Sequence, residues 1–233
     1  MDDRHTASTV TVEHAGSATR VYVNNRVAHA VRANAPHASR PIRRSTIPVV
    51  IQATHHSRIF EGKSTVLIHG DTTVLAYLIA RISSTWPGEI IVTTSDRSED
   101  GALVAEAARC HTRCVRENRD DLVMRLWKAV ENEPCDHFIR VFGNYPLLDT
   151  SAMAAMVDSH LDLDVDYSYN DHHEGVPWGM GCEIISKRAL RTLRDQDLTT
   201  EQKEIGTLYI RQRGSDFSIN RWTSPYADPD VKL

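Results

Sequence analysis

The segment at residues 138–149 places the strongest constraint on how this chain can fold. Its first half is an apolar run of aromatic and β-branched residues, which then passes through Gly143, Asn144 and Pro146 to Asp149. A run of this kind is typical of a buried strand that ends in a tight polar turn. Ligands bind outside the carboxyl ends of strands in open α/β sheets, so we expect chemistry at this turn.

From residue 47 onward, short apolar runs alternate with segments of helical spacing. The predicted strands are 47–53, 89–96, 114–116, 138–142, 164–170 and 182–185, and the predicted helices are 75–82, 100–109, 120–130, 152–160, 187–195 and 200–213. This alternation predicts βαβ units and therefore an α/β fold, with a mostly parallel sheet flanked by helices. We expect one domain over residues 47–233.

Residues 1–46 have a different character and are expected to form an N-terminal arm. The segments 9–12 and 20–23 alternate in residue type, which is compatible with a hairpin, and 26–45 carries several arginines without an apolar face. A linker is expected there. Two interpretations stay open: a loosely ordered extension, and an arm that contacts a partner subunit.

Charge and hydropathy exclude several classes of function. The formal net charge of −4 and the pI of about 6.3 argue against a general nucleic-acid binder, which shows a basic patch. No apolar run approaches the ~20 residues of a membrane span, and no apolar segment follows the charged N-terminus. We therefore expect a cytoplasmic protein with neither nucleic acid nor membrane as a partner.

Five motifs occur in order along the chain. They are Q-A-T-H-H-S-R-I-F-E-G-K at 52–63, V-T-T-S-D at 92–96, R-E-N-R-D-D-L-V-M-R at 116–125, R-V-F-G-N-Y-P-L-L-D at 140–149 and D-Y-S-Y-N at 166–170. Together they resemble the motifs of cytidylyltransferases of the spore-coat polysaccharide type, which are relatives of CMP-KDO synthetase. The resemblance implies a Rossmann-like nucleotidyltransferase fold of the GT-A type.

The resemblance also implies a reaction: an acidic sugar or phosphonate attacks the α-phosphate of CTP, and pyrophosphate leaves. The expected cofactor is Mg²⁺, and the expected partners are CTP, a small acidic acceptor and a second copy of the chain. The site residues it implies are Lys63, Arg58, His55 and His56 for catalysis, Gln52, Ala53, Ser57, Gly62, Thr94, Asp96, Arg140 and Gly143 for nucleotide binding, and Asn144 and Glu183 for the metal.

The residues themselves support part of this assignment. Arg58 and Lys63 lie in a polar loop directly after a predicted strand, where they can hold phosphate. A neutral His55 or His56 can act as a general base and a protonated one can contact phosphate, although both residues can equally be exposed loop histidines.

The chain departs from the family pattern at the expected metal site. Asn144 replaces an aspartate, and a neutral amide oxygen is a weaker ligand for a hard cation than a carboxylate. Glu183 is retained but its partner aspartate is absent, and the tail at 227–233 stops before the family's second metal-binding segment. Three interpretations stay open: a divergent enzyme, a nucleotide-binding scaffold that has lost turnover, and a transferase of altered chemistry.

Overall fold

The computed structural model describes residues 10–15, 18–23, 26–32, 44–57, 60–118, 120–170 and 176–224. The chain divides into two compact units, Met1–Ile42 and Arg43–Leu233. The smaller unit contains an antiparallel sheet of β1 (Val10–Ala15), β2 (Ala18–Val23) and β3 (Arg26–Arg32). The third strand lies in the segment for which the sequence indicated a linker.

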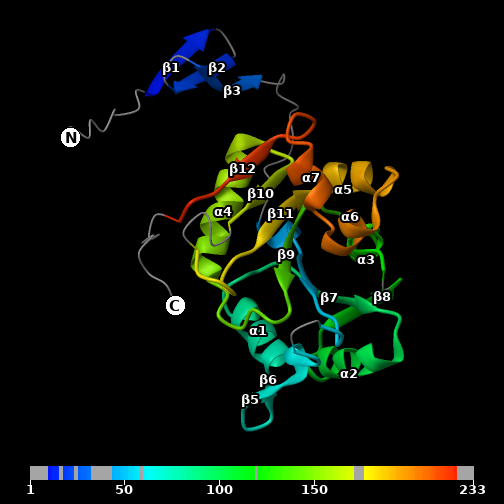
Figure 1. Ribbon diagram of the computed structural model, residues 1–233. Coiled ribbons are helices and arrows are strands. Elements are labelled where there is room, and N and C mark those ends of the chain that lie inside the picture. Colours follow the sequence, from blue (N-terminus) through cyan, green and yellow to red (C-terminus); the bar gives the residue numbers. More distant parts are fainter. Residues whose placement is uncertain are drawn as a thin grey trace, which may run out of the picture. The chain divides into compact units, whose positions relative to one another are not determined.

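The larger unit is built on a seven-stranded sheet with the order β12-β10-β11-β9-β4-β7-β8 (Figure 1). Its strands are β4 (Val49–Gln52), β7 (Ile90–Ser95), β8 (Arg113–Glu117), β9 (His137–Phe142), β10 (Tyr167–Tyr169), β11 (Glu183–Ser186) and β12 (Ile219–Arg221). The strands β9, β4, β7 and β8 run parallel, whereas β11 is antiparallel to both of its neighbours. The predicted α/β class with a mostly parallel sheet is confirmed.

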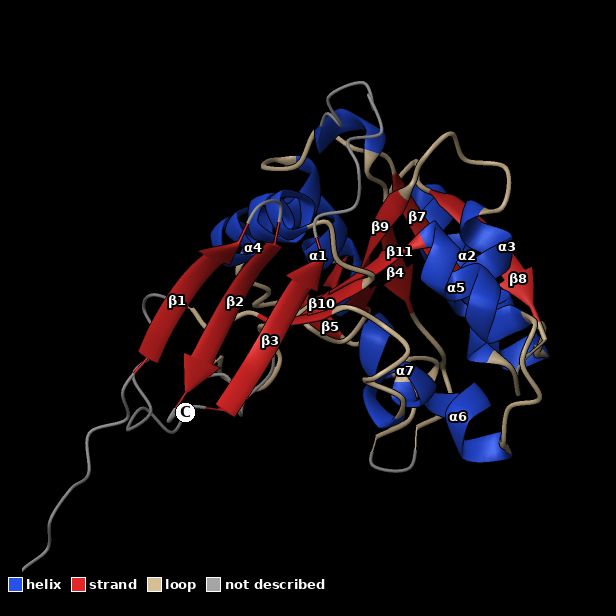
Figure 2. Cartoon of the chain, turned by 90° about the horizontal axis from the view of Figure 1, so that it is seen from above, coloured by secondary structure: helices blue, strands red, loops and turns tan. Residues whose placement is uncertain are grey.

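Helices cover both faces of this sheet (Figures 1 and 2). They are α1 (Val74–Ser83), α2 (Gly101–Arg109), α3 (Leu122–Val130), α4 (Thr150–Leu163), α5 (Lys187–Arg194), α6 (Thr200–Ile205) and α7 (Leu208–Gln212). The helices α3 and α5 pack together on one face, and α1 and α4 lie on the other. None of the helices in the described part of the chain is long and apolar enough to cross a membrane.

The core forms where the central strands are covered on both faces. The side chains of Val50, Ile91 and Phe138 are fully buried and belong to one apolar cluster with residues of α3 and α5. A parallel strand that is buried on both faces needs a continuous apolar run rather than an alternating one. This requirement explains why β4 and β9 could be predicted directly from the sequence.

Side-chain caps fix where most helices begin. The side chains of Thr73, Asp121, Asp149, Ser186 and Thr199 accept hydrogen bonds from backbone N–H groups in the first turns of α1, α3, α4, α5 and α6. Such caps satisfy donors that have no partner within the helix. Four of these helices, α1, α3, α4 and α5, follow a strand directly or after a short turn, so the caps also set how the chain leaves that strand.

Parts of the larger unit differ from the sequence-based expectation. The helix expected over 200–213 is broken into α6 and α7 around Gly206 and Thr207. Thr207 is buried and its hydroxyl bonds to a carboxylate of the sheet, which a continuous helix would not allow. The strand pair β5 (Leu67–His69) and β6 (Thr72–Thr73), which precedes α1, was also not predicted.

Candidate functional site

The candidate site lies at the carboxyl edge of the sheet, where β4, β7 and β9 end side by side. The backbone N–H of Ala53 donates to the carbonyl oxygen of Thr93 at 3.0 Å, and that of Gly143 donates to Gln52 at 2.8 Å. A Cβ atom at position 143 would lie 2.8 Å from the Cβ of Ala53. Gly143 therefore allows the turn after β9 to approach the loop after β4, as the position of both motifs in the sequence suggested.

The loop after β4 is held in place by one buried carboxylate. Asp100 accepts the N–H of His55 at 2.5 Å and the N–H of Ser95 at 3.0 Å, together with the Ser95 hydroxyl. Burial raises the pKa of Asp100, but these hydrogen bonds outweigh it and hold the pKa below its ordinary value. An ionised Asp100 thus ties the loop to the end of β7.

The second half of the loop folds back onto its start. Gly62 has φ of +67°, and its N–H donates to the carbonyl oxygen of His55 at 2.8 Å. A Cβ atom at Gly62 would lie 3.0 Å from the imidazole ring of His55, so a side chain would crowd that ring as well as strain the backbone. The half-buried Lys63 follows and opens a short 3₁₀ turn, Lys63–Thr65.

The two loop histidines differ in their surroundings. The Nδ1 atom of His55 is buried and has no hydrogen-bond partner among the described residues. His56 is exposed, and its Nδ1 lies 3.5 Å from a carboxylate oxygen of Glu61. His55 is therefore the histidine that faces the interior of the loop. The partly buried Ser57 accepts the N–H of Phe60 at 3.5 Å, and Arg58 lies outside the described residues.

Two further candidates, Thr94 and Asp96, lie at the carboxyl end of β7. Thr94 is buried within the strand, and Asp96 is exposed directly after it. The N–H of Asp96 donates to the carbonyl oxygen of Glu117 at 3.1 Å. The structure therefore brings Asp96 to the same edge as the loop after β4, whereas the side chain of Thr94 belongs to the interior.

A buried cluster of charged and hydroxyl groups lies beside this edge. The guanidinium of Arg140 donates to Gln52 at 2.6 and 3.0 Å and to Glu183 at 2.7 Å. Glu183 also accepts hydrogen bonds from Tyr167 at 2.6 Å and from Arg211 at 3.0 Å. Burial raises the pKa of Glu183, but the charges of Arg140 and Arg211 outweigh this effect. The pKa therefore lies below its ordinary value, and the carboxylate is charged. Gln52 and Arg140 are therefore positioned by one ionic network.

This network leaves few free oxygen atoms that could bind a metal ion. Both carboxylate oxygens of Glu183 are engaged, which argues against the metal role expected from the sequence. Asn144 is half-buried in the turn and offers one neutral oxygen, while the carboxylate of Asp149 caps α4. In the part of the chain that the structure describes, no group of three or more His, Cys, Asp or Glu side chains could hold a metal. The residues present do not fit a metal held by the protein alone.

A cavity of about 560 Å³ opens next to the network. Its walls include the aromatic rings of Phe142, Tyr145 and Trp178, and Arg140 and Glu183 form part of its floor. Asn170 also lines it: its Oδ1 accepts the N–H of Cys182 at 2.8 Å, whereas its Nδ2 is buried without a partner among the described residues. A small molecule with oxygen acceptors suits this combination of flat apolar walls and a free donor.

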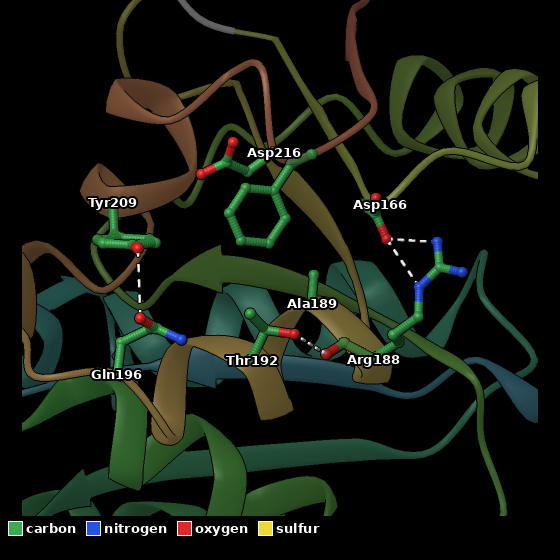
Figure 3. Close-up of a pocket in the computed structure, with 8 residues that line it drawn as sticks. Asp166, Arg188, Ala189, Thr192, Gln196, Tyr209 and Asp216 are labelled. Carbon is green, nitrogen blue, oxygen red and sulfur yellow. Dashed lines mark hydrogen bonds and ion pairs between the residues drawn. The ribbon is translucent and has the colours of Figure 1, made fainter.

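Figure 3 shows a second cavity, of about 430 Å³, on the side of the unit where α5 and α7 lie. Its charged side chains Asp166 and Arg188 pair with each other at 2.6 Å, and Tyr209 donates to Gln196 at 3.4 Å. It contains none of the site residues expected from the sequence. We therefore assign the candidate site to the cavity beside Arg140.

Several residues of the site could not be found from the sequence. The strand positions of Tyr167 and Asn170 were expected, but their roles depend on pairings across the sheet. Arg211 and Trp178 belong to segments with no visible motif of their own. The acidic character of Asp100 was visible, but only the fold shows that it anchors the loop after β4.

Comparisons with known proteins agree with this geometry. The profile of a family described as cytidylyltransferase matches residues 48–228. The spore coat polysaccharide biosynthesis protein SpsF of Bacillus subtilis is 26% identical over 147 residues, which cover 62% of this chain and 60% of SpsF. An uncharacterized protein of Methanocaldococcus jannaschii, MJ1063, is 25% identical over 171 residues, or 73% of this chain and 69% of that protein.

Solved structures show the same fold. A cytidylyltransferase from Leptospira borgpetersenii superposes with a TM-score of 0.74 at 23% identity, covering 81% of this chain and 80% of that one. CMP-2-keto-3-deoxy-manno-octonic acid synthetase in complex with CTP superposes with a TM-score of 0.58 at 14% identity, covering 76% and 90%. These likenesses bear on the fold alone. The cytidylyltransferase family profile matches well over half of the residues of this chain, and the chain therefore belongs to that family.

Proposed function

We propose that the protein transfers CMP from CTP to a small acidic acceptor, a sugar acid or a phosphonate. The observation that carries the proposal is the juxtaposition of the loop after β4, anchored by Asp100, with the turn at Gly143. A nucleotide between them would have its phosphates near Lys63 and its acceptor in the cavity beside Arg140. The structural relative that binds CTP, CMP-2-keto-3-deoxy-manno-octonic acid synthetase, supports the choice of nucleotide.

The reaction needs few groups from the protein. An oxygen of the acceptor forms a bond to the α-phosphorus, the bond to the bridging oxygen of pyrophosphate breaks, and the acceptor's proton passes to a base. Lys63 and Arg58 would offset the charge of the triphosphate, and His55, whose Nδ1 atom has no hydrogen-bond partner among the described residues, would take the proton. Gln52, Ala53, Ser57, Gly62 and Asp96 would shape the nucleotide site.

A divalent cation would enter with the nucleotide. Rv0371c of Mycobacterium tuberculosis, which superposes with a TM-score of 0.55 at 13% identity, has been solved in complex with manganese. Such an ion, Mg²⁺ in our proposal, would withdraw charge from the phosphates. Asn144 offers a neutral amide oxygen in the turn and no charge, so the phosphates would provide most of the ligands.

The state of the expected metal ligands favours a second candidate function. A site whose Glu183 is fully engaged and whose aspartate is replaced by Asn144 can bind a nucleotide without turning it over. In that case the protein would serve as a nucleotide-binding subunit of a larger assembly. The release of pyrophosphate from CTP, measured with a panel of sugar acids and phosphonates, separates the two candidates.

The first experiment is a thermal shift assay with nucleotides, with and without Mg²⁺. A ligand that binds only the native state adds about 2.7 kcal/mol of stability at a hundredfold excess over its Kd. We expect CTP to raise the melting temperature, and Lys63→Ala to reduce the shift because one charged contact with phosphate is lost. Lys128→Ala, an exposed lysine of α3 paired with Glu131, is the matched control. If no nucleotide shifts the melting temperature of the natural protein, the proposal fails.

A further inference from the structure

Arg125 stands out among the charged residues of the larger unit. It lies on α3, only 4% of its side chain is exposed, and the hydroxyl of Thr93 donates to its carbonyl oxygen at 3.3 Å. The Nε and Nη1 atoms of its guanidinium are buried and have no hydrogen-bond partner among the described residues. A buried charged donor that is left unpaired lowers stability, so its presence calls for an explanation.

The nearby carboxylates do not neutralise this charge. Asp100 is occupied by the N–H of His55 and by Ser95, and Asp121 accepts the N–H of Met124 as the cap of α3. No ion pair joins Arg125 to either residue within the described ranges. Both groups attract the guanidinium through space, but they leave its donors free.

A second buried cation makes the position still less favourable. Burial lowers the pKa of Arg125 to about 10, and the charge of Arg140 contributes to the shift. Arg140 is itself neutralised by Glu183. The guanidinium groups of Arg140 and Arg125 thus lie within electrostatic reach of each other at the carboxyl edge of the sheet. Among the described residues a carboxylate is bound to Arg140 and none to Arg125.

A purely structural role does not account for this arrangement. The flanking residues of α3, Leu122 and Leu126, are fully buried and pack in the apolar cluster, and an aliphatic side chain at 125 would pack there without an unpaired charge. A structural arginine would be expected to bind backbone carbonyl oxygens, which Arg125 does not among the described residues. A bound molecule that reaches these buried donors would therefore supply the partner that the described residues do not.

We propose that Arg125 is an anion-binding residue of the candidate site, whose free Nε and Nη1 groups receive an oxyanion of a bound substrate. The oxyanion can belong to a phosphate of the nucleotide or to the carboxylate or phosphonate of the acceptor, since both present acceptor oxygens with negative charge. The inference rests on the proposed function, which supplies these substrates. It gives a substrate-binding role to a residue of α3, whereas the other expected contacts lie in the loops at the carboxyl edge of the sheet.

The test compares Arg125→Gln with the natural protein by calorimetry, using CTP, cytidine, inorganic pyrophosphate and methylphosphonate with CTP present. Loss of one charge-assisted hydrogen bond corresponds to about a tenfold loss of affinity. If a nucleotide phosphate is the source, CTP and pyrophosphate weaken by this factor while cytidine does not. If the acceptor is the source, methylphosphonate weakens and CTP does not. Arg113→Gln, an exposed arginine paired with Glu89 and Glu133, should change none of these affinities.

Two results would overturn the proposal. Unchanged affinities for every probe would place Arg125 outside the site, and an equal loss for cytidine and CTP would make it a contact of the base. Both results leave CTP binding by the natural protein intact, whereas the proposed function fails only if the natural protein binds no nucleotide.

The unliganded variant offers an independent readout. Removal of an unpaired buried charge should leave the melting temperature of the free protein unchanged or raise it, whereas loss of a structural contact would lower it. If Arg125→Gln does not fold, Arg125→Lys takes its place because it keeps the charge but loses the planar fork. Anion affinities in Arg125→Lys that equal those of the natural protein would then refute the assignment.

Discussion

Arg140 connects the candidate site to the stability of the sheet. Its side chain is 2% exposed, and it holds both Gln52, at the end of β4, and Glu183, on β11. Residues that share one ionic network couple strongly, so a change in Arg140 is felt at the nucleotide loop as well as in the interior. Arg140, which the sequence analysis expected to bind nucleotide, is thus also one of the largest fully buried side chains of the unit.

We predict that Arg140→Met destabilises the protein by about 3 kcal/mol or more in urea unfolding, because Glu183 is left buried with one arginine instead of two. Arg113→Met provides the comparison: its ion pairs are exposed, and such pairs contribute at most about 1 kcal/mol. The double variant Arg140→Met with Glu183→Leu should recover part of the loss. A cost below that of Arg113→Met would show that the buried network is not stabilising.

A pair of buried histidines predicts how stability depends on pH. The Nε2 atom of His160 lies 3.0 Å from Nδ1 of His137, and its Nδ1 lies 2.7 Å from the hydroxyl of Ser168. Burial, followed by the neighbouring His137, lowers the pKa of His160 to about 3, and burial also lowers the pKa of His137. Asp136, Asp164 and Asp166 favour protonation of His137 and Arg188 opposes it, but burial prevails.

Both histidines are therefore neutral in the folded state, and the unfolded state binds more protons as the pH falls below about 6.5. Their contribution is fully present above that pH and is lost as the pH decreases toward the folded-state pKa values. We expect the free energy of unfolding to fall by up to about 1.4 kcal/mol per pH unit for each histidine. Urea unfolding between pH 7 and 4.5, above the range where most carboxylates titrate, measures this slope. His160→Gln should flatten it, and an unchanged slope would contradict the assignment.

At the scale of single elements, Asp149 joins the turn after β9 to α4. Its Oδ1 accepts the N–H groups of Ser151 and Ala152, each at 2.9 Å. We predict that Asp149→Ala lowers stability by about 1 kcal/mol, because the first turn of α4 loses its cap. Asp149→Ser keeps a capping oxygen without the charge and should retain most of the stability. If both variants lose equally, the charge rather than the cap is what matters at this position.

The elements that could be predicted from the sequence are those with a strong local signal. The strands β4, β7 and β9 are rich in β-branched and aromatic residues because both of their faces are covered, and α3 combines a capping residue with an apolar stripe. The strand pair β5–β6 was missed because its residues Leu67 and Ile68 are exposed and so carry no pattern of burial. β12 was missed because its three residues are half-buried or exposed and gain their place by pairing with β10.

The candidate site divides in the same way. The loop after β4 and the turn at Gly143 could be placed together from the sequence, since the ends of parallel strands meet at one edge. The hydrogen bond from Arg211 to Glu183 could not be predicted from the sequence, because the two residues belong to elements that meet only in the folded protein. The unpaired donors of Arg125 could not be predicted from the sequence either, because packing and not residue type decides whether a donor finds a partner.

At the scale of the whole molecule, the unit Arg43–Leu233 contains the complete seven-stranded sheet and every described residue of the candidate site. Its first described residues contact the rest of the unit. Arg44 donates to Asp158 at 3.1 Å, and Ile47 is 1% exposed and accepts the indole N–H of Trp86 at 2.9 Å. The unit therefore begins close to residue 43, a few residues before the boundary indicated by the sequence.

We predict that a chain of residues 43–233 folds alone, with the melting temperature of the full chain and the same CTP-induced shift. A chain that starts at residue 50 is the matched control. It lacks Ile47, so it leaves a cavity and an unpaired indole N–H at Trp86, and it should unfold at a lower temperature. Calorimetric melting of both chains, with and without CTP, measures these differences. If residues 43–233 melt well below the full chain, or if CTP no longer stabilises them, then Met1–Ile42 contributes to the fold or to the nucleotide site.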